Sequence, residues 1–148
     1  MSLHSYSKCW LHLIWGTLNR EPLITTKELK KEVSDYLYEY SVSKKIYMKK
    51  NYVNCEHVHA IIDLPTNLSI EETMHLLKGS SSHWINNNKH LEIKFNWGRG
   101  YAALSVSESV LDKVVKYIEG QEEHHRTRSF LEEYEMFISV YGMRYIAD

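Results

Sequence analysis

Short apolar segments separated by polar turns predict four strands in this chain. Each segment is rich in aromatic and branched side chains, as strands that pack into a core usually are. The second and third are joined by a tight turn at Cys55 and Glu56, and Pro65 ends the third. The four predicted strands are residues 6–17, 45–54, 57–64 and 100–106.

Helical spacing of apolar residues predicts two helices between these strands. In residues 27–41 the apolar side chains recur every three or four positions, and Thr26 is a suitable N-cap. Ser69 and Glu72 have the spacing of a capping box, which opens a second helix that extends to about Asn87.

The end of the chain also has a helical pattern. Ser107 is a candidate cap for a helix over residues 108–124, and residues 129–141 resemble a further short helix. Without these two, the order is β-α-β-β-α-β. This order predicts an α+β, ferredoxin-like (RRM-like) fold, in which helices cover one face of an antiparallel sheet. We expect a single domain over residues 1–148, with 108–124 added to the basic unit.

Composition and charge narrow the choice of function. The chain has 148 residues, of which 43% are hydrophobic and 25% charged, as is ordinary for one globular domain. The formal net charge of −1 removes the simplest argument for nucleic-acid binding, a strongly basic domain. No apolar run approaches the roughly 18 residues of a membrane span. Residues 1–8 lack the apolar centre of a signal peptide, so a cytoplasmic protein with reduced Cys9 and Cys55 is expected.

Two of the 9 histidines have a spacing that suggests chemistry. His57 and His59 lie two apart on a predicted strand and therefore point to the same face, while Val58 points to the other. Two neutral imidazoles on one rigid face form half of a divalent metal site. The plainer alternative is a polar pair on a half-exposed sheet.

Other chemistries of this motif fit poorly. A cupin site needs a Glu where Ile62, Asp63 and Leu64 stand, and the metallo-hydrolase pattern is broken by Ile61 and Ile62. A two-histidine phosphodiesterase needs two separated HxT or HxS motifs, and this chain has one HxH motif.

A second candidate pair lies on the predicted helix 108–124. Tyr117 and Gln121 are four apart, so on a helix they are neighbours on one face. A helical tyrosine is usually a packing residue and a glutamine usually a surface one. However, the amide oxygen of Gln121 could ligate a hard cation, and the hydroxyl of Tyr117 could attack a phosphorus that the cation polarises.

Together these motifs resemble the single-tyrosine HUH transposases of insertion sequences and their REP-associated relatives. His57-Val58-His59 matches the HUH motif, and Tyr117 to Gln121 matches the Tyr-x-x-x-Gln segment that follows it. Further matching segments occur in the same order and span roughly residues 6–138. They are Asn19-Arg20-Glu21-Pro22-Leu23, Lys78-Gly79-Ser80-Ser81-Ser82, Trp97, residues 100–107 and residues 121–125.

The resemblance implies an enzyme that cleaves and rejoins single-stranded DNA. It implies Tyr117 as the nucleophile, which forms a 5′-phosphotyrosine, and Mg²⁺ or Mn²⁺ held by His57, His59 and Gln121. It also implies that the substrate is hairpin-forming DNA. Finally, it implies a homodimer in which the tyrosine helix of one chain completes the site of the other.

Basic residues near these motifs are the candidate DNA contacts. Lys49 and Lys50 lie on the predicted strand beside the HUH strand, and Arg126 and Arg128 follow the tyrosine helix. Such pairs more often belong to a solvated surface. Among the other histidines, only His12, on the first strand, has a position that could bring it near the site.

Three other interpretations remain open at this stage. A domesticated REP-associated relative that processes chromosomal repeats would share every catalytic residue. A catalytically inactive single-stranded nucleic-acid-binding module would bind DNA without forming a covalent adduct. An unrelated metal-binding sheet protein would not bind DNA.

Overall fold

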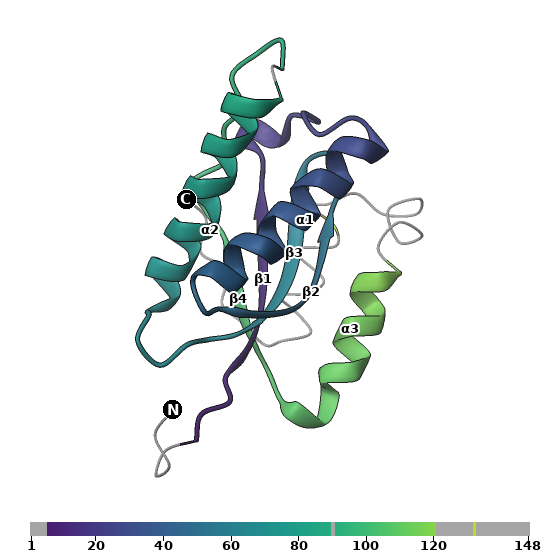
Figure 1. The fold of residues 1–148 in the computed structure, drawn as a ribbon. Helices are drawn as coiled ribbons and strands as arrows, with labels where there is room; N and C mark the ends of the chain where they lie inside the picture. Colours follow the sequence, from purple (N-terminus) through teal and green to yellow (C-terminus); the bar gives the residue numbers. More distant parts are fainter. Residues whose placement is uncertain (1–5, 90, 121–131, 133–148) are drawn as a thin grey trace.

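A computed structural model describes residues 6–89, 91–120 and 132 of the chain (Figure 1). The strands are β1 (Trp10–Gly16), β2 (Tyr47–Val53), β3 (His57–Asp63) and β4 (Ala102–Val106). The helices are α1 (Lys27–Ser43), α2 (Ile70–Asn88) and α3 (Leu111–Glu119), with short 3₁₀ turns η1 (Leu18–Arg20) and η2 (Glu108–Val110). No helix in the described part of the chain is long and apolar enough to span a membrane.

The four strands form one antiparallel sheet in the order β2-β3-β1-β4. The chain reaches this order because α1 connects β1 to β2 and α2 connects β3 to β4, and each crossover leaves room for one strand between its ends. The predicted α+β, ferredoxin-like arrangement is therefore confirmed. The predicted strand 6–17 is shorter than expected, since only Trp10–Gly16 pairs as β1.

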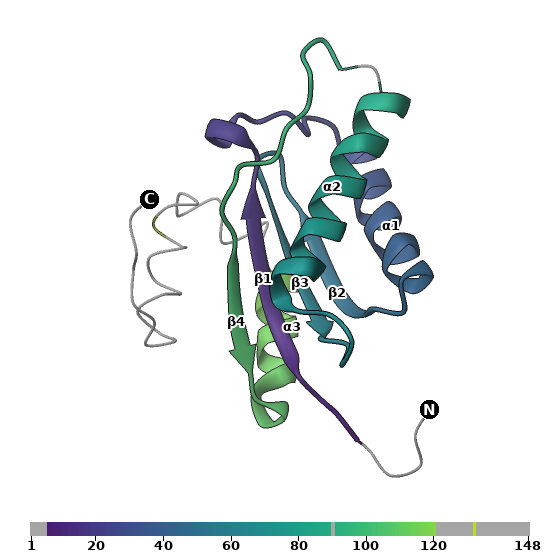
Figure 2. The same ribbon diagram turned by 90° about the vertical axis from the view of Figure 1, so that its left-hand side faces the viewer.

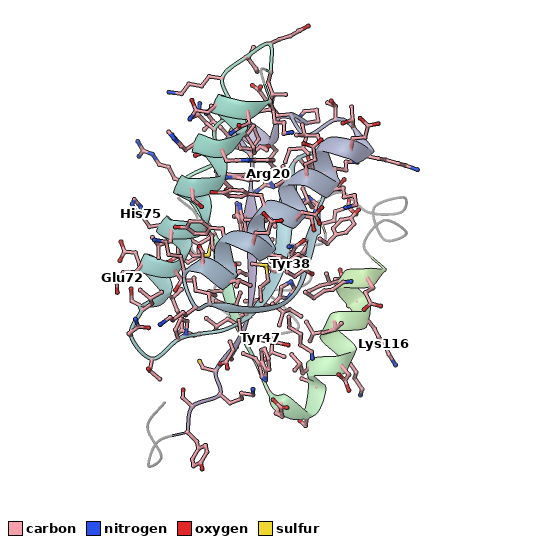
Figure 3. All side chains as sticks on the ribbon, in the orientation of Figure 1. Arg20, Tyr38, Tyr47, Glu72, His75 and Lys116 are labelled. Carbon is pink, nitrogen blue, oxygen red and sulfur yellow. The ribbon has the colours of Figure 1, made fainter. Side chains whose placement is uncertain are left out.

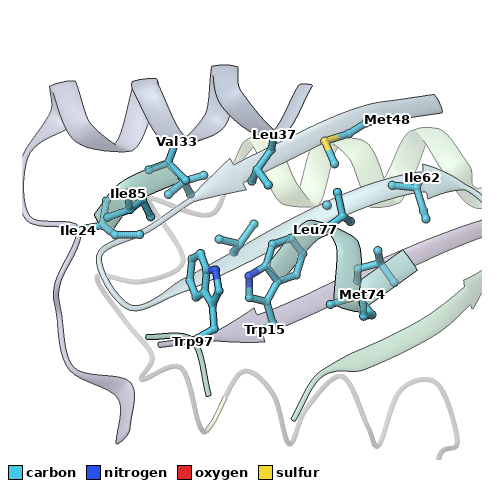
Figure 4. Close-up of a cluster of buried hydrophobic side chains, with 14 of the residues drawn as sticks. Trp15, Ile24, Val33, Leu37, Met48, Ile62, Met74, Leu77, Ile85 and Trp97 are labelled. Atoms are coloured by element: carbon cyan, nitrogen blue, oxygen red, sulfur yellow. The ribbon is translucent and has the colours of Figure 1, made fainter. Parts of the chain in front are cut away.

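Helices α1 and α2 cover one face of the sheet, as Figures 1 and 2 show. The main core lies in this layer (Figure 4) and contains every second residue of the two central strands. From β1 and β3 it takes Leu11, Leu13, Trp15, Val58, Ala60 and Ile62, and from the helices it takes residues such as Val33, Leu37, Met74, Leu77 and Ile85.

The opposite face of the sheet carries the alternate residues and is covered in part by α3. A second, smaller core forms here between the sheet and the helix. It contains Trp10, Ile61, Val106, Leu111 and Ile118. The sheet is thus buried on both faces near its centre, and this explains why β1 and β3 are apolar over most of their length.

Local capping signals in the sequence were predictive for the first two long helices. The Thr26 side chain accepts a hydrogen bond from the backbone N–H of Leu29 at 3.0 Å. Ser69 and Glu72 form the reciprocal capping box, with both hydrogen bonds at 3.0 Å. Each bond satisfies a backbone N–H that lacks a partner within its own helix.

Ser107 occupies the predicted N-cap position, before a helical segment that begins at Glu108, but its side chain does not cap it. Its side chain makes no capping hydrogen bond and instead lies 2.7 Å from the hydroxyl of Ser109. The chain first makes the 3₁₀ turn η2, and α3 then begins at Leu111. Gly120 is the C-cap of α3, and residues 121–124 of the predicted helix, like the predicted helix 129–141, lie outside the described residues.

Side chains of α2 hold the segment that leads into β4. Asn86 exchanges two hydrogen bonds with the backbone of Phe95, at 2.8 and 2.9 Å, and Trp97 donates to Ser81 at 2.9 Å. The ammonium group of Lys78 donates to the carbonyl oxygens of Gly98, Arg99 and Gly100, at 2.6, 3.0 and 3.3 Å. Partial burial lowers the pKa of Lys78, yet the ammonium satisfies three carbonyls that β4 pairing does not reach.

Replacing Lys78 by Met tests this anchoring role. Met keeps an apolar stem but leaves the three carbonyls without the charged donor, so the free energy of unfolding should fall by about 1–3 kcal/mol. Urea denaturation followed by circular dichroism measures this loss. Lys113→Met, which changes an exposed lysine on α3, is the matched control and should stay within about 0.5 kcal/mol of the unchanged protein. Equal stability of the two variants would contradict the anchoring role.

Candidate active site

The pairing of β1 with β3 sets the position of the two predicted ligand histidines. His59 lies opposite Ile14 and His57 opposite Gly16, on the face of the sheet that α3 covers in part. Both imidazoles are buried, with exposed fractions of 1% and 0%, respectively. The alternative of a polar pair on a half-exposed sheet is therefore wrong, and Val58 faces the main core as predicted.

A third histidine joins this pair from the neighbouring strand. Nε2 of His12 lies 2.8 Å from Nδ1 of His59, a hydrogen bond between two buried rings. The ring centroids of His12 and His59 are 5.1 Å apart, and those of His57 and His59 are 5.0 Å apart at an interplanar angle of 76°. The expectation that His12 could lie near the site is confirmed.

Burial determines the protonation state of His12. Removal from water penalises the charged ring and lowers its pKa from 6.5 to about 3. His12 is therefore neutral at physiological pH, with one nitrogen donating and the other accepting hydrogen bonds.

The structure places Tyr117 on the same face as the histidines. Its half-buried side chain packs against a small cluster of Ile14, Ala102 and Leu104. Ile14 is the residue that pairs with His59 across β1 and β3. The α3 helix is held there by Leu111 and Ile118, which are buried in the smaller core.

The donor set fits a divalent cation in part. Two imidazoles fixed on one face of one strand could offer two nitrogen ligands to such an ion. Among the described residues, no group of three His, Cys, Asp or Glu side chains could hold a metal ion. A complete site therefore needs a ligand of another type or from elsewhere, and Gln121, the predicted third ligand, lies outside the described residues.

The predicted DNA-contacting lysines lie on edge strand β2, beside the histidine strand. Lys49 is exposed, and its ammonium lies 5.9 Å from the ring centroid of Trp10. Lys50 forms an ion pair with Glu119 of α3 at 3.9 Å. Exposed Tyr47, labelled in Figure 3, packs edge-on against Trp10. Arg126 and Arg128 lie outside the described residues.

The turn after β1 contains backbone strain that the sequence did not indicate. Asn19 and Arg20 have φ values of 55° and 56°, in the left-handed region that residues other than glycine rarely adopt. Thr17 ties this turn to the residue before the histidine pair, because its backbone N–H donates to the carbonyl of Glu56 at 2.8 Å. Its hydroxyl donates to the carbonyl of Glu21 at 2.7 Å.

The pKa of His12 predicts an acid-sensitive fold in the metal-free protein. Unfolding restores the ordinary pKa of 6.5, so below that pH the unfolded chain takes up a proton that the folded chain does not. The contribution of His12 is present above pH 6.5 and is lost as the pH falls towards 3. Between pH 7 and 5 the loss should reach about 2 kcal/mol.

Urea denaturation at both pH values measures this effect. The variant His12→Gln has no titrating ring at this position. Between pH 7 and 5 its free energy of unfolding should therefore fall by about 2 kcal/mol less than that of the wild-type protein. An identical pH dependence in the two proteins would show that His12 is not the group responsible.

Comparison with known proteins identifies the family and supports the fold. Residues 5–121 match the protein family described as "Transposase IS200 like". A candidate transposase from Deinococcus radiodurans R1 has a similar structure, with a TM-score of 0.64 and 24% identity over 82% of this chain and 96% of that one. A REP-associated tyrosine transposase bound to a REP hairpin has a TM-score of 0.59 and 17% identity over 84% of this chain and 74% of that one. No curated protein matched. Since the family match covers most of the sequence, this chain belongs to the IS200-like transposase family.

Proposed function

We propose that this transposase cleaves and rejoins single-stranded DNA by transesterification, with Tyr117 as the nucleophile. One observation carries the proposal. Tyr117 packs on Ile14, whose strand partner is His59, so a phenol and a histidine pair share one face of the sheet. A nucleophile on the same face as potential metal ligands is an arrangement that supports metal-assisted phosphoryl transfer.

The cleavage step exchanges one phosphodiester for another. The hydroxyl oxygen of Tyr117 forms a bond to the scissile phosphorus while the bond from phosphorus to the 3′ oxygen breaks. The phenolic proton leaves to solvent and the departing 3′ oxygen gains one, which gives a 5′-phosphotyrosine and a free 3′-OH. Because the number of phosphoester bonds is unchanged, a later 3′-OH can reverse the step without an external energy source.

His57 and His59, together with Gln121, would hold Mg²⁺ or Mn²⁺. When bound, the cation polarises the scissile phosphate and offsets the negative charge that develops on it. Two imidazoles and an amide oxygen are neutral ligands, so they leave the full positive charge of the ion available to the phosphate. The burial of both imidazoles on a central strand supports this role, since it fixes their direction before substrate arrives.

We further propose that the substrate is a DNA hairpin formed at the ends of the element. The structurally similar REP-associated transposase was solved with a hairpin. Because the net charge is only −1, affinity must come from local contacts, for which Lys49, Lys50, Arg126 and Arg128 are the candidates. Lys49 is exposed near the ring of Trp10, which in turn packs against the exposed ring of Tyr47, and this combination of charge and an exposed aromatic ring supports a role in holding a single strand.

Replacement of Tyr117 by Phe tests the nucleophile. Wild-type protein, incubated with Mn²⁺ and end-labelled hairpin DNA carrying a single-stranded flank, should give a covalent adduct on a denaturing gel. Tyr117→Phe should give none, because it lacks the attacking oxygen, but it should still bind the hairpin in a mobility-shift assay. Tyr6→Phe, at a side chain that is 91% exposed, is the matched control and should form the adduct normally.

Two results would contradict the proposal. An adduct that persists in Tyr117→Phe would assign the nucleophile to another residue. Wild-type protein that binds hairpins yet forms no adduct with any flank or divalent metal would favour the inactive binding module.

We also propose a homodimer in which the α3 helix of each chain completes the active site of the other chain, that is, in trans. In the single chain described, Leu111 and Ile118 hold α3 on its own sheet. Exchange of α3 between two identical chains would re-form the same contacts on the partner sheet, so it loses none of this burial. The contacts that hold α3 are therefore compatible both with α3 on its own sheet and with α3 exchanged between two chains.

Mixing two inactive variants distinguishes these arrangements. Tyr117→Phe retains the histidines and His57→Ala retains the tyrosine, so a mixed dimer with exchanged helices contains one complete site. Adduct formation should return in an equal mixture, to about a quarter of the wild-type yield if chains pair at random, because half of the dimers are mixed and each mixed dimer has one complete site of two. The adduct should be carried by the His57→Ala chain, which a size tag identifies. No recovery after co-refolding would contradict the trans arrangement.

A further inference from the structure

Metal binding by a histidine depends on which ring nitrogen carries the proton. A neutral imidazole has one N–H and one lone pair, and only the lone pair can bind a cation. Proteins usually fix this choice through a hydrogen bond to the other nitrogen. The partner of a ligand histidine therefore determines whether the ligand is ready to bind.

His59 has such a partner in the structure. Its Nδ1 lies 2.8 Å from Nε2 of His12, so the metal-facing nitrogen of His59 would be Nε2. The two residues are diagonal neighbours on paired strands, because His12 lies opposite Ile61 and His59 lies opposite Ile14. Neither ring is more than 1% exposed, so bulk water does not compete for this hydrogen bond.

Only one of the two possible proton arrangements leaves His59 able to bind a cation. If His12 donates through Nε2–H, the proton of neutral His59 lies on Nε2 and blocks the ligand position. If His59 donates through Nδ1–H, the Nε2 lone pair is available. We propose that His12 is a positioning residue, which accepts the Nδ1–H of His59 and so keeps Nε2 of His59 ready for the divalent cation. This inference rests on the proposed function.

The location of His12 suits this role. Its flanking residues, Leu11 and Leu13, are buried in the main core on the other face of β1, so the backbone that carries the ring is held in place. An imidazole acceptor also adds no negative charge, whereas the carboxylates that often orient ligand histidines do. The hydrogen bond from His59 to His12 thus adds no charge to the proposed ligand set.

The tautomer of His59 can be observed without metal or substrate. In wild-type protein labelled with ¹⁵N-histidine, long-range ¹H–¹⁵N spectra at pH 7.5 distinguish a protonated ring nitrogen from one with a lone pair. The signals of His59 are assigned by their absence in His59→Gln. Nδ1 should carry the proton and Nε2 the lone pair. A proton on Nε2 of His59 in the wild-type protein would overturn the proposal.

Two substitutions at His12 separate hydrogen bonding from packing. In His12→Gln the amide oxygen takes roughly the place of Nε2 and can still accept from His59, whereas His12→Phe keeps a ring but offers no acceptor. Loss of such a partner weakens metal binding by about 10–100-fold, so His12→Phe should bind Mn²⁺ that much more weakly in a calorimetric titration. His12→Gln should stay within about threefold of wild type.

The control is His75→Phe, which changes an exposed histidine that points away from the sheet on α2 (Figure 3) and should leave Mn²⁺ affinity unchanged. Equal weakening in His12→Gln and His12→Phe, with thermal unfolding curves like that of wild type, would indicate a packing role and overturn the proposal. Wild-type affinity in His12→Phe would overturn it too.

The two measurements also separate this inference from the proposed function. If wild-type protein binds no Mn²⁺ but His59 carries its proton on Nδ1, the metal site fails while the assignment of His12 as acceptor stands. If Mn²⁺ binds tightly and the proton lies on Nε2 before binding, the metal site stands and the role of His12 fails.

Discussion

The antiparallel pairing of β1 with β3 is the constraint on which the rest of the structure depends. Because side chains alternate along a strand, this register sends Val58 and Ala60 into the main core and His57 and His59 to the opposite face. A slip of one residue would exchange these sets and bury the imidazoles among apolar side chains. The large core that α1 and α2 form with the sheet therefore fixes the direction of the histidines as well as the fold.

Much of this arrangement was predictable because its signals are local. Thr26 and the pair Ser69 and Glu72 act within one helical turn, so their capping roles can be recognised in the sequence alone. The spacing of His57 and His59 likewise indicates a shared face. The position of Ser107 before the first helical turn was also predictable, but the sequence did not indicate that this turn is a 3₁₀ turn without a side-chain cap.

The features that were not predictable depend on strand pairing. The hydrogen bond between His12 and His59 joins residues 47 positions apart and exists only in this register. The near-complete burial of the imidazoles follows from their place on the central strands, whereas an HxH motif fits a half-exposed strand equally well. Tyr117 could be placed on a helix by its pattern, but its contact with Ile14 required the position of α3 on the sheet.

Basic side chains near the proposed site are paired with acidic ones, as the nearly neutral charge of the chain would suggest. Lys50 of β2 pairs with Glu119 of α3, and Lys8, just before β1, pairs with Asp63 at the end of β3, both at 3.9 Å. Such partly exposed pairs contribute little to stability, so a phosphate can replace the carboxylate at small cost. On the proposed function, a DNA strand would gain cationic contacts here without the excess of positive charge that would attract nucleic acid indiscriminately.

The unequal size of the two cores has a consequence for local unfolding. Helix α3 is held by few buried side chains, chiefly Leu111 and Ile118, whereas α1 and α2 share the extensive main core. Burial of two aliphatic side chains is worth about 3–6 kcal/mol, so α3 should detach at a lower free energy than the sheet unfolds. Its amide hydrogens should exchange with solvent ahead of those of β1 and β3. The proposed nucleophile therefore belongs to the helix with the smallest buried core among the three described, whereas the proposed ligands His57 and His59 belong to a central strand of the main core.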